Sequence, residues 1–144
     1  MILGVIFSFL AGIFICLQSV FNTRVSDKIG LFETTVIVHA IGLTVAVIAI
    51  NIWGDRNFKT LKEVNKLYLL GGVFGVIIIY SVMKGISLLG PTFSVAILLI
   101  TQLILATIID VYGLFGSQKI DFDYTKPLGI LIMIVGIVIF KLKG

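Results

Sequence analysis

The sequence predicts an all-α integral membrane protein in which five transmembrane helices form one domain over residues 1–144. Hydrophobic residues make up 59% of the chain, charged residues only 12%, and the mean hydropathy is +1.21. A soluble domain carries about 25% charged residues. The apolar residues also gather into long segments, and about 20 of them in a row are needed to cross the hydrocarbon core of a bilayer.

The predicted spans are residues 2–21, 34–53, 69–88, 93–112 and 128–140. The first four have the length that a crossing requires. The fifth has only 13 uninterrupted apolar residues, and it crosses if Tyr124 and Lys126 at one end and Lys141 at the other reach toward the headgroups. Four spans plus an interfacial helix is the alternative. The first span has no preceding Lys or Arg and no cleavage motif after it, so we expect it to be retained rather than removed as a secretion signal.

The connections between spans are expected to be loops of about 11–15 residues, with one exception. Between the third and fourth spans, Gly90-Pro91 ends one helix and starts the next. We therefore expect those two helices to be antiparallel neighbours.

Basic residues divide almost evenly between the two sides of the membrane. One side carries six of the eleven: Arg56, Lys59, Lys62, Lys66, Lys119 and Lys126. The other side carries five: Arg24, Lys28, Lys84, Lys141 and Lys143. Orientation normally follows an excess of Lys and Arg on the cytoplasmic side. This sequence has almost no such excess, which favours insertion in both orientations and an antiparallel pair.

Small residues at helical spacing show where helices can approach closely. They are Ser8 and Gly12 in the first span, Gly71 and Gly75 in the third, and Gly129 and Gly136 in the fifth. The plainer interpretation is that they only hold the helices of one chain together.

Polar residues inside apolar spans are the candidates for function, because they usually face a bundle interior or an aqueous cavity. They are Gln18, Asn22, Glu33, His39, Lys84, Gln102 and Asp110. Gln18 and Asn22 are four residues apart and share one face of the first span. Gln102 lies near the centre of the fourth span, and Asp110 is roughly 80° around the helix from it, so both could line one groove.

Each of these residues also has a structural interpretation. Glu33 and Lys84 lie on the same side and could neutralise each other, and a Glu in a first turn suits the helix dipole. Asp110 could be solvated at the interface. His39 could be a hydrogen-bonded packing residue or a proton relay, and the Gln102 amide could hold two helices together.

Several function classes are not expected. The net charge of +4 lies mostly in short loops, where it meets anionic headgroups rather than nucleic acid. The sole cysteine, Cys16, lies in the first span and reads as a small apolar residue. The sequence has no Cys/His cluster, no nucleophile–His–acid set and no phosphate-binding Gly loop. We therefore expect neither an enzyme nor a bound metal or cofactor.

Two stretches of sequence resemble a known family. The run Gly12-Ile-Phe-Ile-Cys-Leu-Gln18-Ser-Val-Phe-Asn22-Thr-Arg24 is similar to the first-span signature of the YdcZ-like family, a five-helix branch of the drug/metabolite transporter superfamily. A second match runs from Leu89-Gly90-Pro91 through Thr101-Gln102-Leu103 to Asp110-Val-Tyr-Gly113-Leu-Phe-Gly116. The family often has Gly-Gln where this chain has Thr101-Gln102. Gly129 and Gly136 also match glycines of the family's last span.

The resemblance implies a half-transporter with a single repeat, located in the cell (inner or plasma) membrane. Its expected partner is a second, antiparallel copy or a paralogue of opposite orientation. The architecture is similar to that of the small multidrug resistance proteins, which use a Glu in the first helix to exchange protons for cationic substrates. This chain has no acidic residue in its first span, so that role is not carried over.

The resulting hypothesis is a secondary transporter, an exporter of small molecules, metabolites or drugs, with a cavity at the midplane of an antiparallel dimer. Gln18, His39 and Gln102 are the expected substrate contacts, and Asp110 or Glu33 the expected proton carrier. Two alternatives from other classes are a small dual-topology ion channel and an assembly subunit without transport. A channel needs polar residues along a whole helix face, and the third and fifth spans offer almost none.

Overall fold

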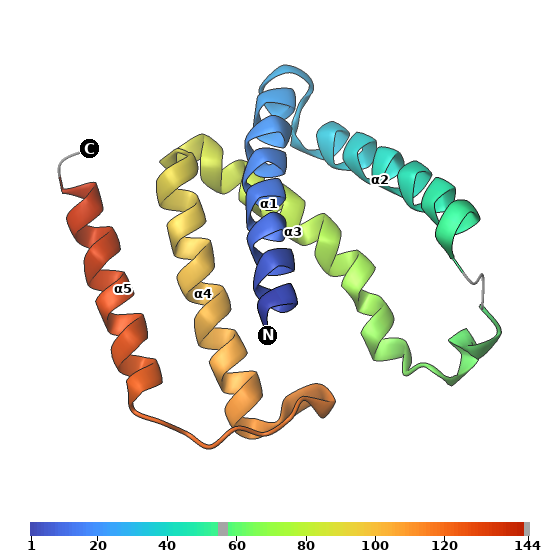
Figure 1. The fold of residues 1–144 in the computed structure, drawn as a ribbon. Helices are drawn as coiled ribbons and strands as arrows, with labels where there is room; N and C mark the ends of the chain where they lie inside the picture. Colours follow the sequence, from blue (N-terminus) through green and yellow to red (C-terminus); the bar gives the residue numbers. More distant parts are fainter. Residues whose placement is uncertain (55–57, 143–144) are drawn as a thin grey trace. The chain divides into compact units, whose positions relative to one another are not determined.

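The computed structural model describes residues 1–54 and 58–142, and these ranges contain helices and loops but no strand. Figure 1 shows the long helices in chain order: α1 (Ile2–Ile29), α2 (Leu31–Trp53), α3 (Gly71–Leu89), α4 (Pro91–Tyr112) and α5 (Thr125–Lys141). Short 3-10 helices lie in the connections: η1 (Lys59–Glu63), η2 (Lys66–Leu70) and η3 (Leu114–Gly116). Arg56 and Lys143 of the charge pattern lie outside the described residues.

Four described segments are long and apolar enough to cross a membrane: α1, α2, η2 together with α3 (Lys66–Leu89), and α4. The all-α prediction is therefore confirmed. The remaining helix, α5, has 17 residues. At 1.5 Å per residue it is about 26 Å long, shorter than the hydrocarbon core of about 30 Å. A fifth crossing through α5 stays a prediction.

The loop predicted over residues 22–33 is wrong. Instead, α1 continues to Ile29 and α2 begins at Leu31, so Gly30 alone separates the two helices. The polar residues that suggested a loop all belong to the last two turns of α1 or the first turn of α2. Polarity here does not mark where the helices end.

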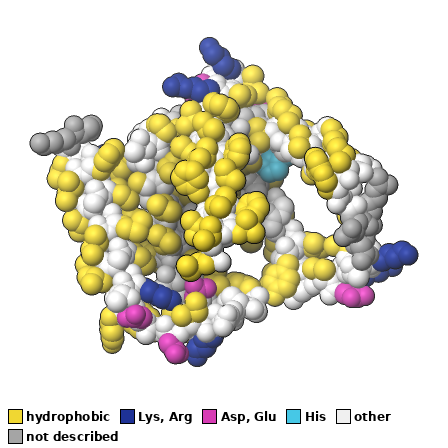
Figure 2. Space-filling view, viewed as in Figure 1, with side chains coloured by type: hydrophobic (Ala, Val, Ile, Leu, Met, Phe, Trp, Pro, Cys, Tyr) yellow, Lys and Arg dark blue, Asp and Glu magenta, His cyan; other side chains and the backbone are white. Residues whose placement is uncertain are grey.

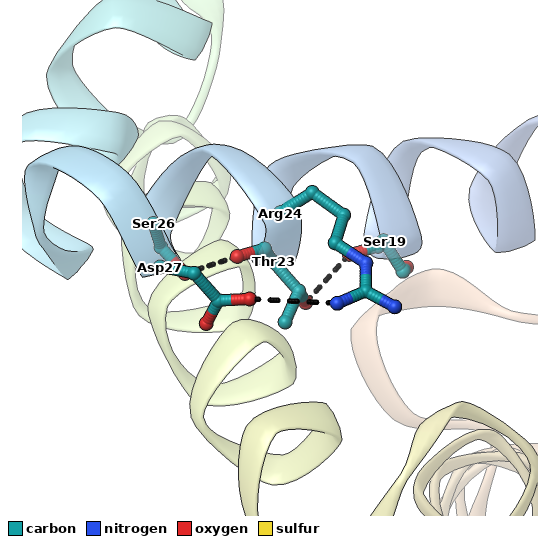
Figure 3. Close-up of polar contacts among 5 residues, drawn as sticks. All are labelled: Ser19, Thr23, Arg24, Ser26 and Asp27. Carbon is teal, nitrogen blue, oxygen red and sulfur yellow. Dashed lines mark hydrogen bonds and ion pairs between the residues drawn. The ribbon is translucent and has the colours of Figure 1, made fainter.

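Contacts along α1 explain why its polar end stays helical (Figure 3). The hydroxyl of Thr23 donates to the carbonyl of Ser19 at 2.8 Å, and the hydroxyl of Ser26 donates to the carbonyl of Thr23 at 2.8 Å. Arg24 and Asp27, three residues apart, form an ion pair with an N–O distance of 3.8 Å. Side chains that bond to their own helix need no loop to satisfy them.

Glycines make the two sharpest connections between helices. Gly30 has φ 101° and ψ 160°, and Gly90 has φ 78° and ψ 161°, a region of backbone space that only glycine adopts readily. The carbonyl of each glycine accepts the first bond of the next helix, from Thr34 at 3.1 Å and from Ser94 at 3.2 Å. The predicted turn at Gly90-Pro91 is confirmed, and Pro91 is the first residue of α4, where its fixed φ suits a helix start.

The chain divides into two compact units, unit 1 (Met1–Leu88) and unit 2 (Leu89–Gly144). In unit 1, α1 packs on α2, and the rings of Phe32 in α2 and Tyr80 in α3 have centroids 4.9 Å apart. The side chains of Thr34 and Met83 are 0% and 1% exposed. In unit 2, α4 packs on α5. The single domain inferred from the sequence stays a prediction.

The surface of the described helices is mostly apolar. Phe, Leu, Ile and Val side chains are exposed on all five helices. Figure 2 shows these yellow side chains on the visible flanks of the helices, with dark blue Lys and Arg at helix ends and connections. A water-soluble protein rarely exposes such continuous apolar surface. Lipid tails or a second membrane chain are the surroundings that suit it.

Candidate functional site

The predicted site residues divide between the two units. Gln18, Glu33 and His39 lie on α1 and α2 of unit 1, whereas Gln102 and Asp110 lie on α4 of unit 2. The surroundings of each residue within its own unit show which chemistry its side chain has available.

His39 has one ring nitrogen engaged and one free. Its Nδ1 lies 2.8 Å from the carbonyl oxygen of Thr35, one turn earlier in α2. A carbonyl only accepts hydrogen bonds, so this contact assigns the proton to Nδ1 and leaves Nε2 of the neutral ring as an acceptor. The ring is half-buried.

Nε2 of His39 faces α3 at Gly75. A Cβ atom at position 75 would lie 3.4 Å from Nε2, which is contact distance. A glycine at this position therefore leaves the free nitrogen accessible. This is a close approach between helices at one of the small residues that the sequence singled out, whereas a Cβ at Gly12 or Gly71 would meet nothing within 4 Å.

Gln18 and Asn22 share a face of α1 as predicted by their spacing, but they differ in burial. Gln18 is exposed, whereas Asn22 is only 8% exposed. Neither amide has a hydrogen-bond partner among the residues that the structure describes. Asn22 was not among the substrate contacts expected from the sequence, because helical spacing alone does not show which residue of a polar pair faces the interior.

Four hydroxyl side chains surround the buried part of unit 1, and each bonds to its own helix. The donors are Ser19 (to the Ile15 carbonyl, 2.6 Å), Thr23 (to Ser19, 2.8 Å), Thr34 (to Gly30, 2.7 Å) and Thr35 (to Leu31, 2.8 Å). All four are at most 8% exposed. Their hydrogen atoms are therefore already committed and unavailable to a neighbouring amide.

Glu33 and Lys84 are not paired with each other in the structure. Both are exposed, and the ion pair found within residues 1–54 and 58–142 is that of Arg24 with Asp27. The carboxylate of Glu33 instead folds back over Gly30, at the start of α2. A carboxylate in this first turn interacts favourably with the helix dipole.

On α4, Gln102 is exposed and Asp110 is half-buried. The hydroxyls of Thr101 and Thr107 bond back to α4 carbonyls at 2.9 and 2.8 Å. The Gln102 amide has no hydrogen-bond partner among the described residues. The backbone carbonyl of Asp110 accepts a hydrogen bond of 2.9 Å from the amide of Ile120. This bond folds the following loop back onto the end of α4.

An open apolar groove of about 530 Å³ runs along one flank of α1. It is lined by Ser8, Phe9, Gly12, Ile13, Cys16 and Leu17. The pair Ser8 and Gly12, which the sequence marked as a place for close helix approach, therefore faces away from the rest of unit 1.

The described residues hold no group of three His, Cys, Asp or Glu side chains that could bind a metal ion. Outside the spans, one carboxyl group is perturbed. The backbone amide of Thr125 donates to the Asp123 carboxylate at 3.1 Å, and this bond, aided by the Thr125 side chain, lowers the pKa of Asp123 below its usual 3.8.

A family model described as "Putative inner membrane exporter, YdcZ" matches residues 3–139. No curated protein and no solved structure matches the chain. The family match covers all five helices, including the parts that carry Gln18, His39, Gln102 and Asp110. Four apolar helices of membrane-spanning length agree with an integral, multi-pass protein of the inner membrane. The chain belongs to the YdcZ-like family of inner-membrane exporters, which are transporters rather than enzymes.

Proposed function

We propose that the chain is a secondary transporter of small molecules that works as an antiparallel dimer around a midplane cavity. The second chain is an identical copy or a paralogue of opposite orientation. Gln18, His39 and Gln102 of both copies supply polar contacts to the substrate. The two halves rock against each other and open the cavity to one side at a time.

The observation that carries this proposal is the exposure of the two glutamines. Gln18 and Gln102 lie within apolar helices, face outward from their units and have no side-chain partner among the described residues. Lipid tails neither donate nor accept hydrogen bonds, so an amide facing them is left unsatisfied. A second copy that encloses both amides in an aqueous cavity removes that penalty.

The apolar groove on α1 supports the same arrangement. A Cβ at Gly12 would meet nothing within 4 Å, and Gly12 lines the open apolar groove of α1. Small residues in such a groove let two backbones approach closely in lipid. The even division of basic residues supplies the antiparallel orientation of the second chain.

Asp110 and Glu33 are the proposed proton carriers. Asp110 lies at the end of α4, half-buried, where a carboxyl group can meet water on one side and the membrane interior on the other. Glu33 lies at the start of α2, where its position over Gly30 also suits a structural role.

Reconstitution into liposomes tests the transport proposal. Substrate-driven proton flux is expected in the unmodified protein, and Gln102→Leu is expected to abolish transport while leaving the dimer intact. Loss of the dimer in Gln102→Leu would show that the amide holds helices together instead. Flux that survives both Asp110→Asn and Glu33→Gln would remove those residues from the mechanism, and very fast dissipative flux or single-channel currents would favour a channel.

Labelling of cysteines placed at the two termini, with Cys16 first replaced, tests dual insertion. Each terminus should be labelled from both sides of the membrane. Two added Lys residues near the C-terminus should bias the chain one way, and two in the 113–127 loop the other way. Each biased variant alone should be inactive, and their co-expression should restore transport. If each terminus is labelled from one side only, dual insertion is wrong, and the inverted partner must be a paralogue of opposite orientation.

A further inference from the structure

We infer that Asn22 binds the substrate and that this substrate is an uncharged solute carrying hydroxyl or amide groups rather than a lipophilic cation. The inference rests on the proposed transporter function and extends it by a residue and a substrate class. It follows from the state of the Asn22 amide, from its contrast with Asn51, and from the charges nearby.

The Asn22 side chain is buried but its amide is unsatisfied. The residue is 8% exposed, as much as its neighbour Ser19. None of the described residues bonds to its amide. In the same part of the chain, no fully enclosed side-chain nitrogen or oxygen lacks a partner. The Asn22 amide must therefore reach accessible space, although the rest of the side chain is covered.

Asn51 shows that an asparagine in these helices can satisfy itself. Its Nδ2 donates to the carbonyl of Val47, one turn earlier in α2, at 2.6 Å. Asn22 makes no such bond to α1, and the hydroxyls of Ser19 and Thr23 on the same face are donated to backbone carbonyls. An amide on a mostly covered side chain is unfavourable without a hydrogen-bond partner, so a partner from outside the chain is expected.

The chemistry of that partner follows from the groups that unit 1 leaves free. A carboxamide offers two donors and one acceptor, and Nε2 of His39 offers one more acceptor. Both groups reach accessible space. Hydroxyl and amide groups complement such a set, since they donate and accept hydrogen bonds without a net charge.

The charges near this end of α1 disfavour a cation. The Asp27 carboxylate is paired with Arg24, and the Glu33 carboxylate lies over Gly30. Lys28, on the last turn of α1, has no ion-pair partner among the described residues. A lipophilic cation at this end of α1 would meet Arg24 and Lys28, whose positive charges repel it, and the carboxylate paired with Arg24 is already engaged.

Thermal unfolding of the purified, detergent-solubilised full chain tests the inference with two defined probes. N-acetylethanolamine is neutral and carries a hydroxyl and an amide, and tetraphenylphosphonium is a lipophilic cation. The neutral probe should raise the Tm of the unmodified chain by mass action. Asn22→Leu should weaken the apparent affinity about tenfold or more, whereas the matched control Asn51→Leu should keep it.

Two further variants keep the test decisive. Asn22→Ser replaces the amide by a hydroxyl that can bond to α1 as Ser19 does, so this variant should fold even if Asn22→Leu does not. It should still lose the rise in Tm caused by N-acetylethanolamine. Asn22→Asp adds a free carboxylate and should gain a response to tetraphenylphosphonium. Gly75→Ala places a methyl group against Nε2 of His39. This variant should lower the apparent affinity for N-acetylethanolamine without removing His39.

The inference is overturned if the unmodified chain responds to tetraphenylphosphonium and not to N-acetylethanolamine, or if Asn22→Ser responds as the unmodified chain does. Loss of the dimer in Asn22→Ser, read by crosslinking, would assign the amide to packing between copies and would also overturn it. Binding is measured without flux, so the substrate site can fail while transport by the dimer stands. If the unmodified chain forms no dimer and shows no flux, the proposed transporter function is itself refuted.

Discussion

Unit 1 and unit 2 bury their side chains very differently. All residues that the structure describes as buried belong to unit 1, and five of these seven are polar: Ser19, Asn22, Thr23, Thr34 and Thr35. The other two are Met83 and Ile86 of α3. In unit 2, neither α4 nor α5 has a buried residue. Unit 1 therefore has a small interior of its own, whereas α4 and α5 of unit 2 enclose no buried side chain.

The comparison shows two ways in which a membrane helix can be stabilised. Four of the seven buried residues of unit 1 carry small hydroxyl side chains that bond to their own helices and allow close approach, as expected where apolar burial does not drive association. Unit 2 has exposed apolar side chains that its two helices do not cover for each other. A second chain or lipid must cover that surface, which is consistent with the proposed dimer.

The largest difference between the units should appear on removal of a methionine side chain. Met83→Ala empties a site that is 1% exposed, and it should destabilise the chain by about 2 kcal/mol through the cavity it leaves. Met133→Ala, in the half-exposed middle of α5, should have a much smaller effect. Thermal unfolding of both variants in detergent measures this. Equal effects would show that α5 is as well packed as α3.

Substitution of the two connecting glycines should have the next largest effect. Gly30→Ala and Gly90→Ala should each cost about 1–3 kcal/mol, because their backbones lie in a glycine-only region. Only Gly30→Ala, in unit 1, also displaces the Glu33 carboxylate; a Cβ at Gly90 meets nothing within 4 Å. Gly30→Ala combined with Glu33→Ala should therefore recover part of the loss. A Gly90→Ala variant as unstable as Gly30→Ala would point to a contact of Gly90 outside the described residues.

The smallest effect concerns the loop of unit 2 before α5. The pKa of Asp123 is lowered on folding, so its contribution to stability is fully present above the unfolded value of 3.8 and is lost as the pH falls through the lower folded value. Asp123→Ala should lower the Tm slightly at neutral pH, and the two melting curves should converge below pH 3.8. Asp121→Ala, which removes an exposed neighbouring carboxylate, is the control. A pH-independent difference would refute this account.

The positions of the spans could be predicted from sequence because the length of an apolar run decides whether a helix crosses a bilayer. The end of α1 could not be predicted from sequence, because Arg24, Ser26 and Asp27 are typical loop residues. Only the structure shows that they bond along the helix. Gly90 was recognisable as a turn through the proline after it, whereas Gly30 has no such mark. The polarity of Gln18 and Asn22 pointed to α1 as a functional helix, but their different burial depends on neighbours that are distant in sequence.

The single-residue connection at Gly30 has a mechanical consequence. A helix of 28 residues such as α1 is about 42 Å long, so its charged end lies beyond a hydrocarbon core of about 30 Å or the helix tilts within it. No slack follows that end, because α2 starts one residue later. A tilt or rotation of α1 during transport is therefore passed directly to α2 and to His39, with only the backbone angles of Gly30 to absorb the difference. Gly30 is therefore the hinge between α1 and α2.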